Sequence, residues 1–172
     1  MRTIINKLLL YLMIFSAIFW FGFNASKVFA LVYIFNPETM EVKSQLSANY
    51  LKGFFYLFYP ILVLSQSLYV FFISSSILYL LFGEKISFKK EGWALMILII
   101  LLICLPLEFY LFLLDYQINL EIQKFNDMNL EKVVSLVKDR FQKLSYFPFA
   151  QIFLHLSIIY LAVLKPLRKE KL

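Results

Sequence analysis

The sequence predicts an all-α, polytopic integral membrane protein that has four transmembrane helices and an extracytoplasmic helical hairpin between the third and the fourth. Composition is the first sign, since 62% of the 172 residues are hydrophobic and 19% are aromatic, which exceeds the apolar share of ordinary soluble domains. The apolar residues also gather in four long stretches. A span needs about 20 such residues, because a helix rises about 1.5 Å per residue. Lys and Arg residues flank the stretches, as is typical of membrane proteins.

We expect these stretches to form one four-helix membrane domain over residues 1–172. The spans are expected at about residues 8–26, 54–82, 93–115 and 147–164. We interpret the first stretch as a retained helix and not as a cleaved signal peptide, because no small-x-small cleavage site closes it. The second stretch carries Pro60, Gln66 and the run Ser74-Ser75-Ser76. Small and hydrogen-bonding groups allow helices to pack closely in lipid, so we expect this span to lie centrally.

A polar but patterned segment of about residues 116–146 separates the third and fourth stretches. Its apolar side chains recur at intervals of three and four residues, which is the spacing of one face of a helix. This face consists of Leu130, Val133, Val137, Phe141 and Leu144. The pattern predicts a protruding helical hairpin that turns near residues 126–129, and we expect its apolar face to bind a partner protein.

The positions of the basic residues predict the orientation of the domain. Three short segments that fall on one side of the membrane contain Arg2, Lys7, Lys85, Lys89, Lys90, Lys165, Arg168, Lys169 and Lys171. Because short cytoplasmic segments carry an excess of Lys and Arg, we expect both termini in the cytoplasm. The small size and short loops favour a bacterial inner membrane. Contacts with lipid headgroups account for the net charge of +6, so the expected partners are the bilayer and other membrane protein subunits, and not nucleic acid.

Ionisable residues inside a span cost several kcal/mol unless they are paired or hydrated, so each one is a candidate functional residue. Counting along straight helices places Lys27, Glu108 and His155 at a similar depth in the outer half of the bilayer. Asn24 lies one helical turn from Lys27, and Gln66 falls at a comparable depth on the second span. We therefore hypothesise that these residues form a polar pocket, open to the outer side, that binds a small ligand, a lipid headgroup or a proton.

The same residues also have plainer interpretations. Lys27 lies close enough to the membrane boundary to extend its amine to water, and Glu108 is able to pair with Lys27 as a purely structural contact. We expect His155 to hydrogen-bond between helices, since the sequence has no second His and no Cys pair to complete a metal site. Cys104 is the single cysteine, so the chain forms no internal disulfide. We expect no metal and no cofactor.

Three classes of function are compatible with these patterns. The leading one is an accessory or scaffold subunit of a membrane complex, because no catalytic constellation is present and the hairpin offers an apolar face. The second is a small transporter, channel or lipid-binding protein that uses the polar pocket. The third is a membrane hydrolase, since Asp115 and Asp139 imitate in position the aspartate pair of the lipoprotein signal peptidases. Neither residue lies in that family's asparagine-containing motifs, and Asp139 is expected on a solvated helix face beside Lys138 and Arg140. We therefore expect no enzyme activity.

Overall fold

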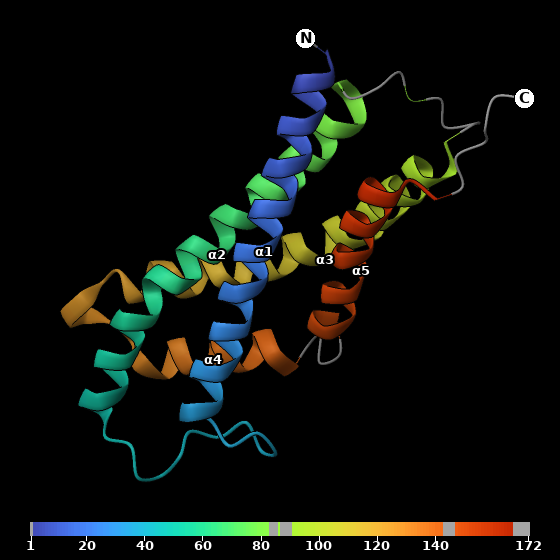
Figure 1. The fold of residues 1–172 in the computed structure, drawn as a ribbon. Coiled ribbons are helices and arrows are strands. Elements are labelled where there is room, and N and C mark those ends of the chain that lie inside the picture. Colours follow the sequence, from blue (N-terminus) through green and yellow to red (C-terminus); the bar gives the residue numbers. More distant parts are fainter. Residues whose placement is uncertain (1, 83–85, 87–90, 143–146, 167–172) are drawn as a thin grey trace, which may run out of the picture.

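The computed structural model describes residues 2–82, 86, 91–142 and 147–166. The described residues form helices and no extended strand, and Phe35 and Val42 form an isolated bridge. The helices are α1 (Arg2–Ile34), α2 (Ala48–Phe82), α3 (Gly92–Ile122), the short 3₁₀ helix η1 (Phe125–Asp127), α4 (Leu130–Gln142) and α5 (Phe147–Leu164). The prediction of an all-helical protein is confirmed. Figure 1 shows the start of α1 and the end of α5 at the same end of the molecule.

Three helices of the described chain are long and apolar enough to cross a membrane. Their apolar segments are Ile4–Ile34, Ala48–Phe82 and Gly92–Ile122. Helix α5 contains a shorter apolar segment, Ala150–Leu164. These helices are compatible with the predicted helical membrane protein, since a helix satisfies its own backbone hydrogen bonds and so tolerates lipid around it.

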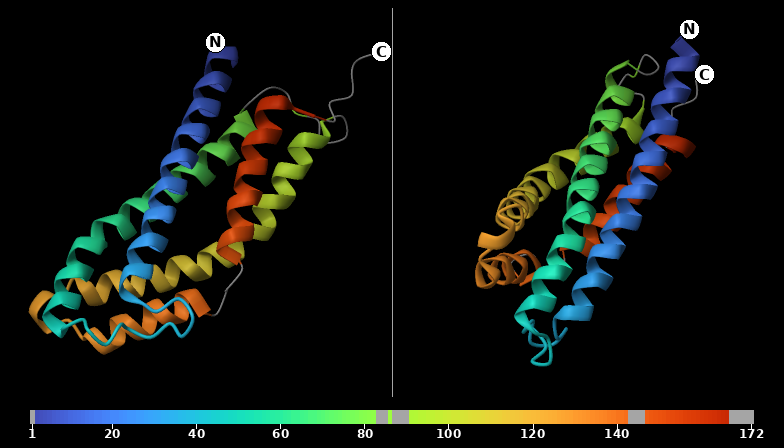
Figure 2. Two further views of the ribbon diagram at one scale, coloured as in Figure 1. Left: turned by 60° about the horizontal axis from the view of Figure 1, so that its bottom comes forward. Right: turned by 90° about the vertical axis from the view of Figure 1, so that its left-hand side faces the viewer.

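Helix α3 bends near Pro106. Proline has no N–H to donate to the carbonyl oxygen of Leu102 one turn earlier, and its ring crowds that oxygen, so helices bend at such positions. The first part of α3 runs beside α5, whereas the second part turns away and runs beside α4 (Figure 2). In the right-hand view of Figure 2, α4 and the end of α3 are seen nearly end-on, while α1 and α2 are seen along their length. Helix α4 and the last part of α3 therefore cross the long pair of helices α1 and α2 at a steep angle.

Buried Glu121 stabilises the connection between α3 and α4. Its Oε2 forms ion pairs with Nζ of Lys124 at 2.8 Å and with Nζ of Lys132 at 3.0 Å. The same carboxylate accepts the backbone N–H of Asn129 at 3.3 Å. Because Asn129 precedes α4, this bond satisfies a donor at the start of a helix, where backbone N–H groups have no partner in the helix itself.

The apolar face of α4 packs inside this chain. Val133 and Val137 are buried in a cluster with Phe55 of α2 and Ile118 of α3. Leu130 and Phe141 are half-buried, and the fifth predicted member of the face, Leu144, lies outside the described residues. The two valines expected to bind a partner protein therefore bury their apolar surface against the chain's own helices.

Two hydrophobic clusters make up the interior. The first joins α1, α2, α3 and α5 and contains Met13, Trp20, Phe72, Trp93, Cys104 and Ile158 among others. The second joins α1, α2, α3 and α4 and contains Leu31, Phe55, Leu62, Ile118 and Val133 among others. Along α1, α2 and α3 the two sets occupy opposite ends of the helix, with buried polar residues between them. The sequence therefore folds into two apolar regions separated by a polar layer.

Candidate functional site

The polar layer consists of side chains that are between 2% and 9% exposed. They are Lys27, Glu108, Asp115, Arg140, Gln151 and His155. They come from α1, α3, α4 and α5. Burying ionised groups away from water is costly unless each is paired and hydrogen-bonded. The pairing of these side chains therefore determines how the protein tolerates the buried charges and which chemistry the layer can perform.

Asp115 is the centre of the charged part of the layer. Its Oδ2 lies 3.6 Å from Nζ of Lys27, and Nε of Arg140 donates a hydrogen bond to its Oδ1. One carboxylate thus contacts two buried cations, one from α1 and one from α4. The contact with Arg140 is a charge-assisted hydrogen bond, which is the stronger kind, and the contact with Lys27 is an ion pair. They tie the crossing helices together at a single point.

The guanidinium of Arg140 is held by this contact through its Nε. Burial lowers the pKa of Arg140, but the neighbouring Asp115 carboxylate and its hydrogen bond outweigh burial and raise the pKa above its ordinary value. The guanidinium also lies 5.3 Å from the ring centre of Phe141, a cation–π distance. Arg140 is therefore a permanent buried cation.

Glu108 lies in a second, separate part of the layer. Its Oε2 accepts a hydrogen bond from Nε2 of Gln151 on α5. One turn further along α5, Nδ1 of His155 lies 2.7 Å from the carbonyl oxygen of Gln151. The imidazole packs against Trp20, with ring centres 4.9 Å apart. Its Nε2 is buried and has no hydrogen-bond partner among the described residues.

The remaining predicted site residues lie at the margins of the layer. Gln66 donates to the carbonyl oxygen of Phe112 at 3.3 Å and accepts from Asn119 at 3.0 Å, so it ties α2 to α3. Asn24 is half-buried. It lines a small cavity of about 60 Å³ together with Lys27, Arg140 and Gln151.

The structure thus brings together only some of the residues that the sequence singled out. Lys27 pairs with Asp115 and not with Glu108. Its side chain is 5% exposed, so the amine remains in the interior and does not extend to water. Lys27 and Asn24 line the same cavity. His155 lies one helical turn after Gln151, the residue that hydrogen-bonds to Glu108.

Arg140 and Gln151 were not among the predicted site residues, and Asp115 was considered only as one of a hydrolase pair with Asp139. The expectation that Arg140 lies on a solvated face is wrong, since it is 7% exposed. The sequence contains a signal for the burial of Arg140. This residue follows Val137 by three residues and Val133 by seven, which places it on the apolar face of the helix. A cation on the buried face of an amphipathic helix predicts a buried acid opposite to it.

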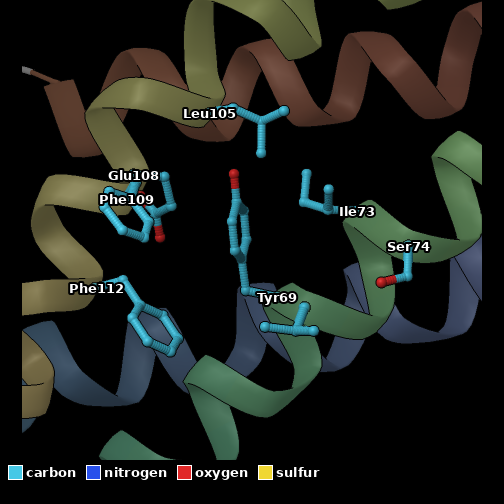
Figure 3. Close-up of a pocket in the computed structure, with 8 residues that line it drawn as sticks. Tyr69, Ile73, Ser74, Leu105, Glu108, Phe109 and Phe112 are labelled. Carbon is cyan, nitrogen blue, oxygen red and sulfur yellow. The ribbon is translucent and has the colours of Figure 1, made fainter.

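A larger cavity of about 260 Å³ lies between α2 and α3 (Figure 3). Its lining is mostly apolar and consists of Tyr69, Val70, Ile73, Ser74, Leu105, Glu108, Phe109 and Phe112. Figure 3 shows the hydroxyl of Tyr69 pointing toward Leu105 in the middle of the lining residues. Glu108 therefore belongs both to the polar layer and to the wall of this cavity.

No protein-family model, curated protein or solved structure matches this chain. Within the described residues, no group of three or more His, Cys, Asp and Glu side chains is placed to hold a metal ion.

Proposed function

We propose that this chain is a small membrane protein that binds an amphipathic ligand from the bilayer in the cavity between α2 and α3, beside the polar layer. The observation that carries the proposal is the position of Glu108. Its carboxylate is buried among apolar helices, is held by Gln151, and lines a cavity of about 260 Å³. Ionisable groups at membrane depth are uncommon and usually serve ligands, ions or protons.

Stability alone does not account for the polar layer. Replacing a buried ion pair by well-packed apolar side chains is often neutral or stabilising, by about 1–4 kcal/mol. Two apolar clusters already flank the layer, and further apolar residues would join them. Polar groups at this position therefore support a role in binding.

The proposal includes four spans, with both termini in the cytoplasm of a bacterial cell. Helix α5 has 18 residues, which corresponds to about 27 Å and is close to the thickness of the hydrocarbon layer. The start of α1 and the end of α5 lie at the same end of the molecule (Figure 1). The crossing segment formed by α4 and the end of α3 would then lie toward the outer boundary of the membrane.

Native mass spectrometry of the protein in a mild detergent tests the proposal. The wild-type protein should retain a bound lipid or other amphipathic molecule. Leu105→Trp should lose it, because the indole fills the cavity that Leu105 lines. The matched control is Leu102→Trp, since Leu102 lies on the same helix and is 62% exposed. A wild-type protein without any bound molecule, or equal retention by both variants, would contradict the proposal.

An accessory or scaffold subunit is the second candidate function. Helix α1 packs along α2, and its other side exposes large apolar residues, among them Tyr11 at 67% and Ile18 at 61%. A partner helix would cover this side. A photoreactive amino acid at position 18 should then give one discrete protein adduct in intact membranes, and one at position 102 should give none. Labelling of lipid alone from both positions would exclude this role for α1.

A further inference from the structure

We infer that the ligand of this cavity is a neutral amphipathic molecule with a hydroxyl head group, of the fatty-alcohol or monoacylglycerol kind. The inference rests on the proposed function and specifies its ligand. It depends on which polar groups of the wall have no partner, on the charged groups that line the cavity, and on the route into the cavity.

The first observation is that the cavity wall contains a buried hydroxyl group without a partner. Tyr69 is 6% exposed, and its hydroxyl has no hydrogen-bond partner among the described residues. Ser75 and Ser76 of the same helix both donate to the carbonyl oxygen of Phe72. Ser74, which lines the cavity, makes no such bond within the described chain. A buried phenol without a partner is costly, and an acceptor on a ligand would remove that cost.

The second observation is that Glu108 presents an acceptor to the same space. Gln151 holds its Oε2 from the side of α5, which orients the carboxyl group where it borders the cavity. A head group placed here meets a donor, the Tyr69 hydroxyl, and an acceptor, the Glu108 carboxylate. A hydroxyl group satisfies both, because it donates one hydrogen bond and accepts others.

The third observation concerns charge. The cations Lys27 and Arg140 are both held by Asp115. No Lys, Arg or His is among the described residues that line the cavity. A carboxylate head group would therefore face Glu108 without a cation to pair with, which is expensive at membrane depth. An ammonium head group only donates hydrogen bonds, so it offers no acceptor to the Tyr69 hydroxyl. A neutral hydroxyl group avoids both costs.

The fourth observation is the route into the cavity. Val70 and Phe109 line it and are exposed, at 51% and 64%. Their outer sides would contact lipid chains, so the cavity opens laterally between α2 and α3. Sites for drug-sized ligands occupy about 300–1,000 Å³. A cavity of about 260 Å³ suits a head group and the first part of its chain, with the rest of the chain in the bilayer.

Photolabelling with three probes of equal chain length tests the head group. The probes are hexadecanol, hexadecylamine and hexadecanoic acid, each carrying a diazirine at the same carbon near the head group, in nanodiscs of phosphatidylcholine. Hexadecanol should label peptides of α2 and α3 at the cavity several-fold more than either charged probe. Tyr69→Phe keeps the ring and removes the hydroxyl, so it should reduce this labelling about two- to tenfold. The matched control is Ser67→Ala, since the exposed Ser67 hydroxyl bonds to its own helix.

The outcomes separate this inference from the proposed function. Preferential labelling by either charged probe, or equal labelling by hexadecanol in the wild type and Tyr69→Phe, would overturn the hydroxyl assignment and leave lipid binding intact. If none of the three probes labels the wild-type protein more strongly than Leu105→Trp, the result would contradict the proposed function itself.

Discussion

Arg140 hydrogen-bonds to Asp115 across 25 residues of sequence, and this contact joins α4 to α3 inside an apolar interior. Lys27 reaches the other oxygen of the same carboxylate from α1. Helix α1 and the paired segments of α3 and α4 that cross it therefore share one ionic centre. The stability of the crossing segment should depend on this centre more than on any single apolar contact.

Asp115→Asn should destabilise the protein strongly. The substitution leaves the buried cations Lys27 and Arg140 without a counter-charge, and breaking a buried pair in this way costs about 3–5 kcal/mol. Thermal unfolding in detergent, followed by intrinsic fluorescence, measures the effect. Asp127→Asn is the control, because Asp127 is exposed and such changes stay within about 0.5 kcal/mol. Equal unfolding temperatures of the two variants would argue against a buried ionic centre.

Removing the whole ionic centre should be less harmful than removing the acid alone. In the triple variant Lys27→Met, Asp115→Leu and Arg140→Met, no charge remains unpaired, and the apolar side chains join the clusters on either side. We expect the triple variant to recover much of the stability lost in Asp115→Asn, as for other buried ionic groups. A triple variant that is less stable than Asp115→Asn would show that the charges make a favourable contribution beyond mutual neutralisation.

His155 should behave as a packing residue. Its ring is 2% exposed and lies against Trp20, Tyr69 and Phe72. His155→Phe keeps an aromatic ring in this place, so we expect little loss of stability and unchanged retention of the ligand in native mass spectrometry. His155→Ala should cost about 2 kcal/mol or more through the cavity that it leaves. Loss of the ligand in a well-folded His155→Phe protein would instead place His155 in the binding site.

Cysteine labelling should distinguish the two faces of α4. Cys104 is fully buried and is replaced by Ala to give a background without thiols. In intact cells, Glu131→Cys should react readily with a maleimide that does not cross membranes, because Glu131 is exposed and α4 is proposed to lie outside. Val133→Cys should react slowly, since Val133 is 0% exposed. Reaction of position 131 only after the membrane is permeabilised would reverse the proposed orientation.

The helices could be predicted from the sequence because helix formation here depends on residues that are close together in the chain. A long apolar stretch in lipid must satisfy its own backbone hydrogen bonds, so hydrophobicity and length are sufficient. The helix turn near residues 126–129 was also visible in the pattern, and the structure has η1 at Phe125–Asp127. Such features depend on a few neighbouring residues.

The pairing within the polar layer was not predictable in the same way. Depth was counted along straight helices, and this placed Lys27 level with Glu108. Helix α3 bends near Pro106, so residues after the bend leave that axis, and Asp115 approaches Lys27 instead. A proline inside a helix favours a bend, but the direction of the bend depends on how α4 and α5 pack against α3. The cavity likewise depends on the packing of α2 against α3 and has no sequence signature.

A structure determined in lipid nanodiscs would show whether the cavity between α2 and α3 holds an amphipathic ligand. Elongated density should run from the bilayer between Val70 and Phe109 and end at the Tyr69 hydroxyl and the Glu108 carboxylate, with Asp115 between its two cations. A cavity closed by the protein's own side chains, with Glu108 turned to the lipid, would contradict the account.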